Sequence, residues 1–227
     1  MKNAHQLFVI CFIIGFSFQG LLAQEKINQL NANGKRIGVW TKKFSNGKIR
    51  YVGQFKNGKE IGIFKFYSPL SSIHPIAIKT FENQSNLVKV TYFNVQGVLE
   101  SEGKMDGKKR IGLWKYYQDK GKKLLSKENY KNGVLEGESA TYYKTGKIAE
   151  RLFYKNGKLD GNTKRYAANG ILLNNLNYKD GKLNGLAKYY DIKGKLIYTG
   201  NYENDVKVGK WEYFENGKSV NVDKIKQ

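Results

Sequence analysis

Aromatic and apolar positions recur along most of this chain with a period of 24 residues, and glycines punctuate them at fixed places. Tyr130 returns as Tyr154 and Tyr178, and each is followed by Lys-Asn-Gly or Lys-Asp-Gly. A second set of glycines keeps the same step, at Gly137, Gly161, Gly185 and Gly209. A fixed period of this size indicates a tandem array of small structural units, each stabilised by its neighbours.

The unit at 154–178 shows what each repeat should form. Asn156–Gly157 is the favoured dipeptide of a two-residue hairpin turn, because both central residues take positive φ. Asn169–Gly170 is a second turn signal about half a period later, and the residues between the two turns suit one β-strand. Turn dipeptides interrupt the chain too often for helices of ordinary length. The pattern therefore predicts an all-β protein, built as an elongated single-layer antiparallel sheet of tandem β-hairpins.

The array extends over residues 24–217 and contains about eight units, followed by a C-terminal tail at 218–227. The unit at 82–105 is degenerate, because the glycine of its opening turn is missing. The two prolines of the chain, Pro69 and Pro75, fall in the segment 68–75. Proline cannot donate to a central ladder, so this segment is expected to be a loop or an edge.

Aromatic residues occupy one register of the repeat, five residues after the second glycine: Tyr67, Tyr117, Tyr142, Tyr166, Tyr190 and Phe214. Side chains alternate faces along a strand, so these rings form a stripe across the sheet. The favoured interpretation is that they are the core of a thin sheet. The alternative is an exposed candidate binding face, which we assign to Tyr142, Tyr166, Tyr190, Lys158 and Lys182. The second glycine of each unit is expected to make room for a ring or a neighbouring backbone.

The N-terminus has the pattern of a secretory signal. Lys2 precedes a largely apolar run at 7–22, and Ala23 offers a cleavage point before Gln24. The run is short for a spanning helix and no positive cluster follows it, although a retained anchor is the alternative. We therefore predict a signal helix at 1–23 that is cleaved, leaving no transmembrane span, and a protein that is periplasmic, envelope-associated or secreted. Cleavage removes Cys11, the one cysteine, and with it any disulfide or thiol chemistry.

The formal charge of the whole chain is +21, and only Lys2 is lost with the signal. Such a charge favours anionic partners such as lipid headgroups or acidic polysaccharide. The simpler interpretation is that the lysines are solvated neighbours of turn glycines, which keep exposed edges soluble. Nucleic acid is disfavoured as a partner, because the rings are interpreted as structural and export removes the usual nucleic acids.

Catalytic residues are not expected in this chain. Its histidines are His5 and His74, which cannot supply a metal site or an acid/base pair, and no cofactor motif is present. Glu136 and Asp160 hold equivalent repeat positions and could approach each other from neighbouring strands. Periodic carboxylates are more typical of solvated turns than of a hydrolase, so we expect no enzyme.

The repeat carries a family resemblance in its motif of an aromatic residue, Asn-Gly-Lys, a spaced glycine, an aromatic pair and Gly-Lys. The motif occurs at 154–161, and again at 178–185 followed by Tyr189, Tyr190, Gly194 and Lys195. From about residue 31 to 217 the chain resembles the MORN repeat family, and more closely its bacterial variant found in YwqK-like proteins. The resemblance implies an elongated array of antiparallel hairpins, with protein–protein contacts and phospholipid binding. Many bacterial members are described as the antitoxin component of a toxin–antitoxin system.

These observations lead to one functional expectation and two alternatives. We expect an exported, non-enzymatic scaffold that presents a long sheet to another protein of the cell envelope. The first alternative is a peripheral binder of anionic lipid or polysaccharide that uses a basic surface. The second alternative, implied by the resemblance, is an antitoxin-like inhibitor.

Overall fold

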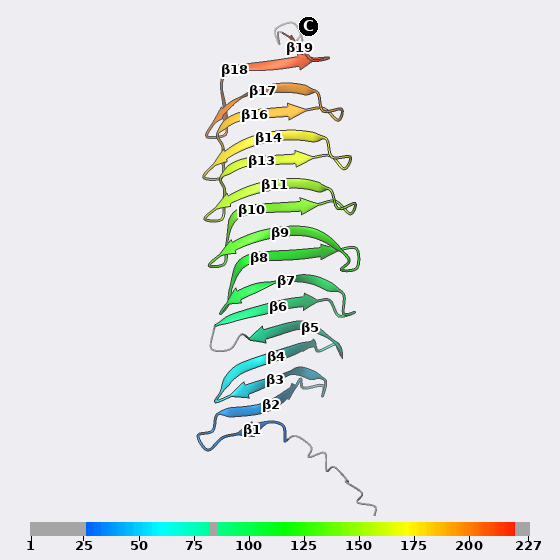
Figure 1. The fold of residues 1–227 in the computed structure, drawn as a ribbon, viewed down its shortest axis with the longest axis vertical. Coiled ribbons are helices and arrows are strands. Elements are labelled where there is room, and N and C mark those ends of the chain that lie inside the picture. The colour runs from blue at the N-terminus through cyan, green and yellow to red at the C-terminus, as the bar shows by residue number, and fades with distance from the viewer. Residues whose placement is uncertain (1–25, 82–85, 221–227) are drawn as a thin grey trace, which may run out of the picture.

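The computed structural model describes residues 26–81 and 86–220, which form one antiparallel sheet of 19 strands (Figure 1). The sheet begins with β1 (Gln29–Leu30) and ends with β19 (Lys218–Val220), and the strands follow one another in chain order. Within the described residues no second layer covers either face. The predicted single-layer array of antiparallel hairpins is therefore confirmed. The predicted signal helix at 1–23 lies outside the described residues.

The strand bounds show the regularity of the array. The first part contains β2 (Arg36–Lys43), β3 (Ile49–Lys56), β4 (Lys59–Ser68), β5 (Ser71–Phe81), β6 (Leu87–Phe93) and β7 (Leu99–Asp106). The middle part contains β8 (Lys109–Gln118), β9 (Lys123–Lys131), β10 (Val134–Tyr142), β11 (Ile148–Lys155), β12 (Lys158–Leu159) and β13 (Gly161–Tyr166). The last part contains β14 (Leu172–Lys179), β15 (Lys182–Leu183), β16 (Gly185–Tyr190), β17 (Leu196–Glu203) and β18 (Val206–Glu215). The short strands β12 and β15 pair with β11 and β14, and so begin the strands that β13 and β16 continue.

The Asn-Gly turns form a stack along one long edge of the sheet. Asn156 and Gly157 have φ values of 50° and 79°, as the two-residue hairpin requires. The Gly157 amide donates to the carbonyl of Leu135 in the preceding unit over 2.9 Å, and Gly181 donates to Leu159 over 2.7 Å. Each turn therefore satisfies a backbone group of its neighbour, which ties successive hairpins together.

The second glycine of each unit has a different role from the one expected. Gly137 and Gly161 have φ values of 85° and 117°, in the region that L side chains rarely adopt. A Cβ at Gly137 would meet nothing within 4 Å, and the same holds at Gly38, Gly112 and Gly209. The expectation that these glycines make room for a ring is therefore wrong at those positions. A local turn of the backbone requires them, and the strand register shifts there in several units.

The degenerate unit still supplies the strands β6 and β7 within its described part. Val88 takes the place of the second glycine and lies opposite Phe81. The pairing of β5 with β6 has no register shift, because Val88 does not need the positive φ. This unit departs from the repeat in sequence and keeps its place in the sheet.

The proline segment is a strand for most of its length, so the prediction of a loop is wrong for 71–75, but these residues pair on one side only and form a local edge, as the alternative predicted. Ser71–Phe81 forms β5, which lies between β4 and β6. Pro75 pairs with Tyr67 at a shift of register, and the pairing with β6 begins only at Ala77. The missing N–H of Pro75 therefore falls beyond the shared ladder, where it leaves no central hydrogen bond unmade.

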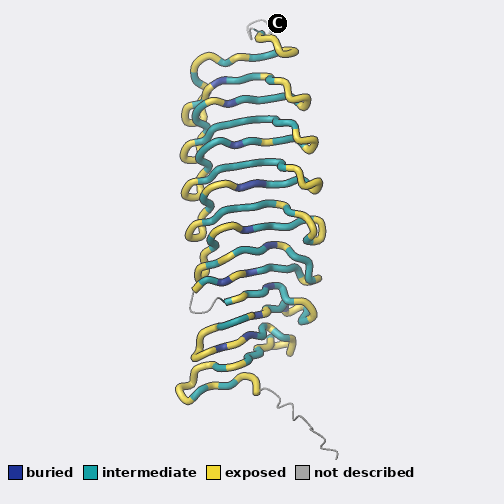
Figure 2. Tube along the Cα trace, in the orientation of Figure 1, coloured by how far each residue is buried: buried dark blue, intermediate teal, exposed yellow. Residues whose placement is uncertain are grey.

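Buried residues lie near the middle of the strands, and exposed residues gather in the turns at both long edges (Figure 2). Because neighbouring residues on a strand point to opposite sides, the sheet has two distinct faces. The aromatic face comprises the strand residues on the same side as Phe64, Trp114 and Trp211. The lysine face comprises those on the same side as Lys115, Lys164 and Lys188. The main cluster of buried apolar residues lies on the aromatic face, around Val88, Val90 and Trp114.

Candidate binding faces of the sheet

A central row of the aromatic face places large rings next to glycines. Three rings lie beside glycines of the preceding strand: Phe64 beside Gly53, Trp114 beside Gly103 and Trp211 beside Gly200. A Cβ added at any of these glycines would overlap the ring. Phe64 is 1% exposed and Trp114 is fully buried, in a sheet with one layer. These rings reach that burial by lying flat over a strand that has no side chain at this point.

The same row is filled differently in the centre of the array. Ser139 lies opposite Leu152, and Thr163 lies opposite Leu176. Both small residues are buried. A small residue beside a leucine thus replaces a ring beside a glycine, and the row stays closed in both cases.

Rings on this face cluster on the strands from β2 to β9 and again from β16 to β18, and we call these two regions the aromatic ends of the array. Phe64 contacts Phe55 and Phe81 with ring centres 5.2 and 5.3 Å apart. At the C-terminal end, Tyr189 stacks on Tyr198 with centres 4.4 Å apart, as in other offset ring pairs. Within the residues that the structure describes, no protein layer covers these clusters.

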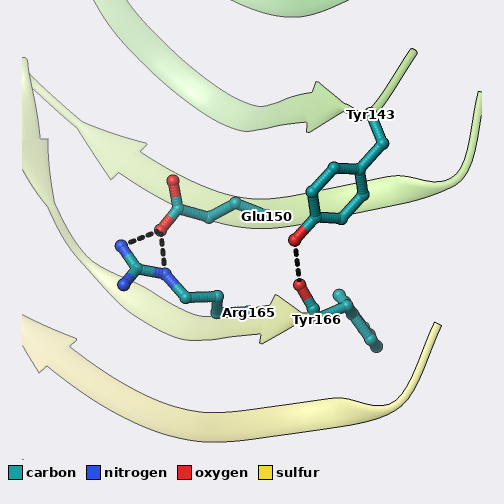
Figure 3. A network of polar contacts seen from close by, with 4 residues as sticks. All are labelled: Tyr143, Glu150, Arg165 and Tyr166. Atoms are coloured by element: carbon teal, nitrogen blue, oxygen red, sulfur yellow. Dashed lines mark hydrogen bonds and ion pairs between the residues drawn. The ribbon is translucent and has the colours of Figure 1, made fainter. Parts of the chain in front are cut away.

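A polar segment separates the two clusters. Arg165 forms an ion pair of 3.2 Å with Glu150, the residue opposite it on β11 (Figure 3). The Arg165 side chain is 61% exposed. Figure 3 also shows the Tyr143 hydroxyl, which donates to the carbonyl of Tyr166 over 2.7 Å and joins two successive hairpins. The centre of this face therefore offers charge and hydrogen bonds where the ends offer rings.

Tyrosine hydroxyls around this segment stay protonated at neutral pH. Burial raises the pKa of Tyr154, and the nearby carboxylates of Glu150 and Glu128 raise it further. Burial also raises the pKa of Tyr178, with a further contribution from Asp205 and Glu150. These hydroxyls therefore act as hydrogen-bonding groups and carry no negative charge.

A second network lies at the aromatic end, around Arg110. Its guanidinium lies 4.6 Å from the centre of the Trp114 ring and donates to the hydroxyls of Tyr116 and Tyr130. Burial alone would lower the pKa of Arg110, but the hydrogen bond with Tyr130 and the nearby negative groups raise it overall. Arg110 is therefore held in its charged form against the ring, a cation–π arrangement.

The lysine face carries a row of cations that the sequence analysis did not identify. The row consists of Lys115, Lys127, Arg151, Lys164 and Lys188, on β8, β9, β11, β13 and β16. Lys115 lies directly opposite Lys127, and Arg151 lies directly opposite Lys164. The period of the repeat could have revealed the row, because Lys127 and Arg151 are one period apart, as are Lys164 and Lys188.

The five residues predicted as a binding face are divided between two places. Tyr142, Tyr166 and Tyr190 are half-buried on the lysine face, and the Lys127 ammonium lies 5.8 Å from the Tyr142 ring centre. Lys158 and Lys182 are exposed in the stacked turns at the opposite edge. The distance along a strand from Lys158 to Tyr166 is about 26 Å, at about 3.3 Å per residue. The tyrosines and the two lysines therefore cannot contact one small ligand together, and a binding role for either group stays a prediction.

Glu136 and Asp160 have a structural role in the turn stack. The Glu136 carboxylate accepts the backbone N–H of Asn156 over 2.7 Å, and Asp160 accepts that of Asp180 over 3.2 Å. Each carboxylate thus binds the next turn of the array. In the part of the chain that the structure describes, no group of His, Cys, Asp and Glu could hold a metal ion, and no helix could span a membrane.

Comparison with known proteins identifies the repeats. Four segments match the family model described as MORN repeat variant, at residues 36–57, 135–156, 159–180 and 183–204. The first segment contains β2 and β3, and the other three follow one another from β10 to β17. A comparison with curated proteins gives no match.

Proposed function

The chain belongs to the MORN repeat variant family, with four matching repeats, and from this premise we propose that it is an exported scaffold without catalytic activity that binds a protein partner through its aromatic face. The observation that carries the proposal is the pair of ring clusters on a one-layer sheet, whose members include the half-buried Tyr189 and Tyr198, with no layer over them within the described residues. Tyrosine and tryptophan side chains that keep part of their surface accessible are enriched at interaction sites.

The residue types on this face support a protein partner. Tyrosine, tryptophan and arginine are the residues that most often dominate the binding energy of protein interfaces. The aromatic face carries all three, with Trp211 and Tyr198 at one end and Arg165 in the centre. The described strands extend about 75 Å along the array, at about 4.8 Å per strand, which is ample for an interface of ordinary size.

The polar centre gives such an interface a means of selecting its partner. Arg165 and Glu150 are an ion pair with one exposed member, so a partner carboxylate or cation can join the pair. Charged groups at an interface contribute more to partner choice than to affinity. The location outside the cytoplasm rests on the signal-like pattern of residues 1–23 and is part of the proposal.

Asn174 and Asn175 on β14 provide a matched test. They are neighbours of the same type, and Asn174 lies opposite Tyr189 on the aromatic face while Asn175 lies opposite Lys188 on the lysine face. A photoreactive residue at each position would be expressed in the native cells and irradiated, and crosslinked proteins identified in the envelope fraction. We expect a specific protein adduct from position 174 and none from position 175.

Two further measurements complete the test. Arg165→Glu should reduce the yield of the adduct from position 174 without changing the melting temperature by more than a few degrees. N-terminal sequencing of the protein from its native cells should begin at Gln24. An adduct from position 175 alone, or an intact Met1 in the cytoplasm, would contradict the proposed face or the proposed location respectively.

A further inference from the structure

The row of cations on the lysine face crosses seven neighbouring strands without a carboxylate in the row itself. Ala140 and Asn175 complete it between the five cations, so that each member lies opposite the next in the ladder. From Lys115 to Lys188 the row spans about 29 Å, at about 4.8 Å per strand. We call these seven residues the cation row.

Among the described residues, only two of the five cations in the row have an ion-pair partner. Lys115 lies 3.7 Å from Glu102, and Arg151 lies 3.2 Å from Glu138. Among the described residues, Lys127, Lys164 and Lys188 form no ion pair. Glu102 is also shared, because it accepts the Tyr117 hydroxyl over 2.6 Å, and burial with this carboxylate raises the pKa of Tyr117 to about 12.

Two pairs of like charges in the row, Lys115–Lys127 and Arg151–Lys164, are held directly opposite each other. Such pairs destabilise a sheet. At the edge of the array the pairs Lys155–Lys158 and Lys179–Lys182 also occur, but these side chains are exposed and can turn into water. In the cation row Lys127 and Lys164 are half-buried in the middle of a face, where side chains on both sides limit such movement. An anion lying along the row would remove this repulsion.

Tyrosines follow the cation row along one side. Lys115, Lys164 and Lys188 are each two residues before a tyrosine on the same strand and therefore on the same face. Those tyrosines are Tyr117, Tyr166 and Tyr190, and Tyr142 continues the line. Asparagines, including Asn162 and Asn177, lie on the other side. The result is a track one residue wide, with tyrosines along one border and asparagines interspersed with Leu113, Glu138 and Leu186 along the other.

We infer that the cation row is a binding track for a single linear chain of acidic sugar residues, lying across the strands. A narrow track of half-buried cations suits one extended polyanion, whereas a lipid surface would meet the exposed lysines of the turn edge first. Tyrosine rings can stack on the apolar faces of sugar rings, and lysines can bind their carboxylates. This site lies on the face opposite to the proposed protein site, so the two proposals can fail separately.

The test compares two double variants of the full-length chain, purified from expressing cells. Lys164→Gln with Lys188→Gln removes two members of the cation row. Lys158→Gln with Lys182→Gln removes the same charge from the same two units at the edge of the sheet. Binding is measured by fluorescence anisotropy with a labelled oligogalacturonate of about ten residues, long enough to cover the track of about 29 Å.

We expect the row variant to lose at least about tenfold in affinity at about 0.15 M salt, and the edge variant to lose less than about twofold. The row variant should also melt no lower than the unsubstituted protein, because like-charge repulsion is removed. Equal losses in the two variants would show binding by general charge and overturn the track. Tighter binding of single-stranded DNA of equal charge, or of phosphatidylglycerol vesicles, would overturn the choice of an acidic polysaccharide.

Discussion

The ends and the centre of the aromatic face solve one packing problem in two ways. At the ends, a ring such as Trp114 covers the glycine of the neighbouring strand, Gly103. In the centre, Thr163 fills the same row and its neighbour is Leu176. The ladder continues through both regions. The comparison teaches that side chains of neighbouring strands fill the row together, so the side chain at one position can be interpreted only with its neighbour.

The largest effect on stability is expected when a leucine, as found in the centre, replaces a glycine beside a ring of an aromatic end. Gly103→Leu would drive a side chain into the Trp114 ring, whose base cannot move without shifting the strand. We expect a loss of more than about 3 kcal/mol of unfolding free energy, at the upper end of overpacking effects. Hydrogen exchange should show the damage in β6–β9 first, because repeat arrays unfold locally.

A double variant turns this prediction into a direct test of the comparison. Gly103→Leu with Trp114→Thr replaces the glycine and the ring by the leucine and the threonine found in the centre. This double variant should recover a large part of the unfolding free energy that Gly103→Leu alone loses. Two residues in contact are expected to show such coupling. If the double variant is as unstable as the sum of the two single variants, the two solutions are not interchangeable.

Truncating single side chains of the row should give a smaller difference in unfolding free energy between the two regions. Trp114→Ala should cost about 3–5 kcal/mol, as for other fully buried rings. Thr163→Ala should cost about 1 kcal/mol, because little volume is removed from the centre. Chemical denaturation of both variants gives the comparison. Similar costs at the two sites would mean that the rings do not carry the stability of the ends.

The stacked turns should behave alike in both regions. Gly58 at the N-terminal end and Gly157 in the centre have φ values of 82° and 79°. Valine at either position should cost about 1–3 kcal/mol, since a β-branched residue is strained at positive φ. Thermal melts are the measurement, with Thr145→Val as a control in an exposed turn. A loss of stability in only one of the two valine variants would show that the turn stack depends on the side chains of the adjoining strands.

The smallest effect is expected from the arginines. Arg165→Gln removes an exposed ion pair and should change the unfolding free energy by no more than about 1 kcal/mol. Arg110→Gln should cost somewhat more, about 1–2 kcal/mol, because that guanidinium stacks on Trp114 and binds two tyrosine hydroxyls. Melting curves of the two variants under one buffer give the order, and a reversed order would contradict the assigned packing of Arg110.

Much of the fold could be predicted because the turns are local. Asn156–Gly157 specifies a hairpin through the φ values of two adjacent residues, and equivalent turn residues recur with the period of the repeat. The family resemblance has the same origin, since the matched segments contain these turns. At Pro75 the local rule left a loop and an edge open, and the extent of the pairing between β5 and β6 decided that this proline lies in a strand with one unpaired side.

The candidate sites were less accessible to prediction. Tyr142, Tyr166 and Tyr190 were identified by their common register, but Lys158 and Lys182 were grouped with them although they lie at the opposite edge. Lys127 and Arg151 lie on strands whose side chains meet Lys115 and Lys164 only through the register. A one-residue slip of that register would send each side chain to the other face.

The sequence by itself determined the hairpin unit, its period and the absence of helices from the array, because turn glycines and asparagines act through their own backbone angles. Only the tertiary structure decided which residues share a face. The glycines that accommodate rings, the central exchange of rings for leucines and the cation row all arise between strands. Each depends on residues a strand apart being brought opposite one another, and that pairing is a property of the assembled sheet.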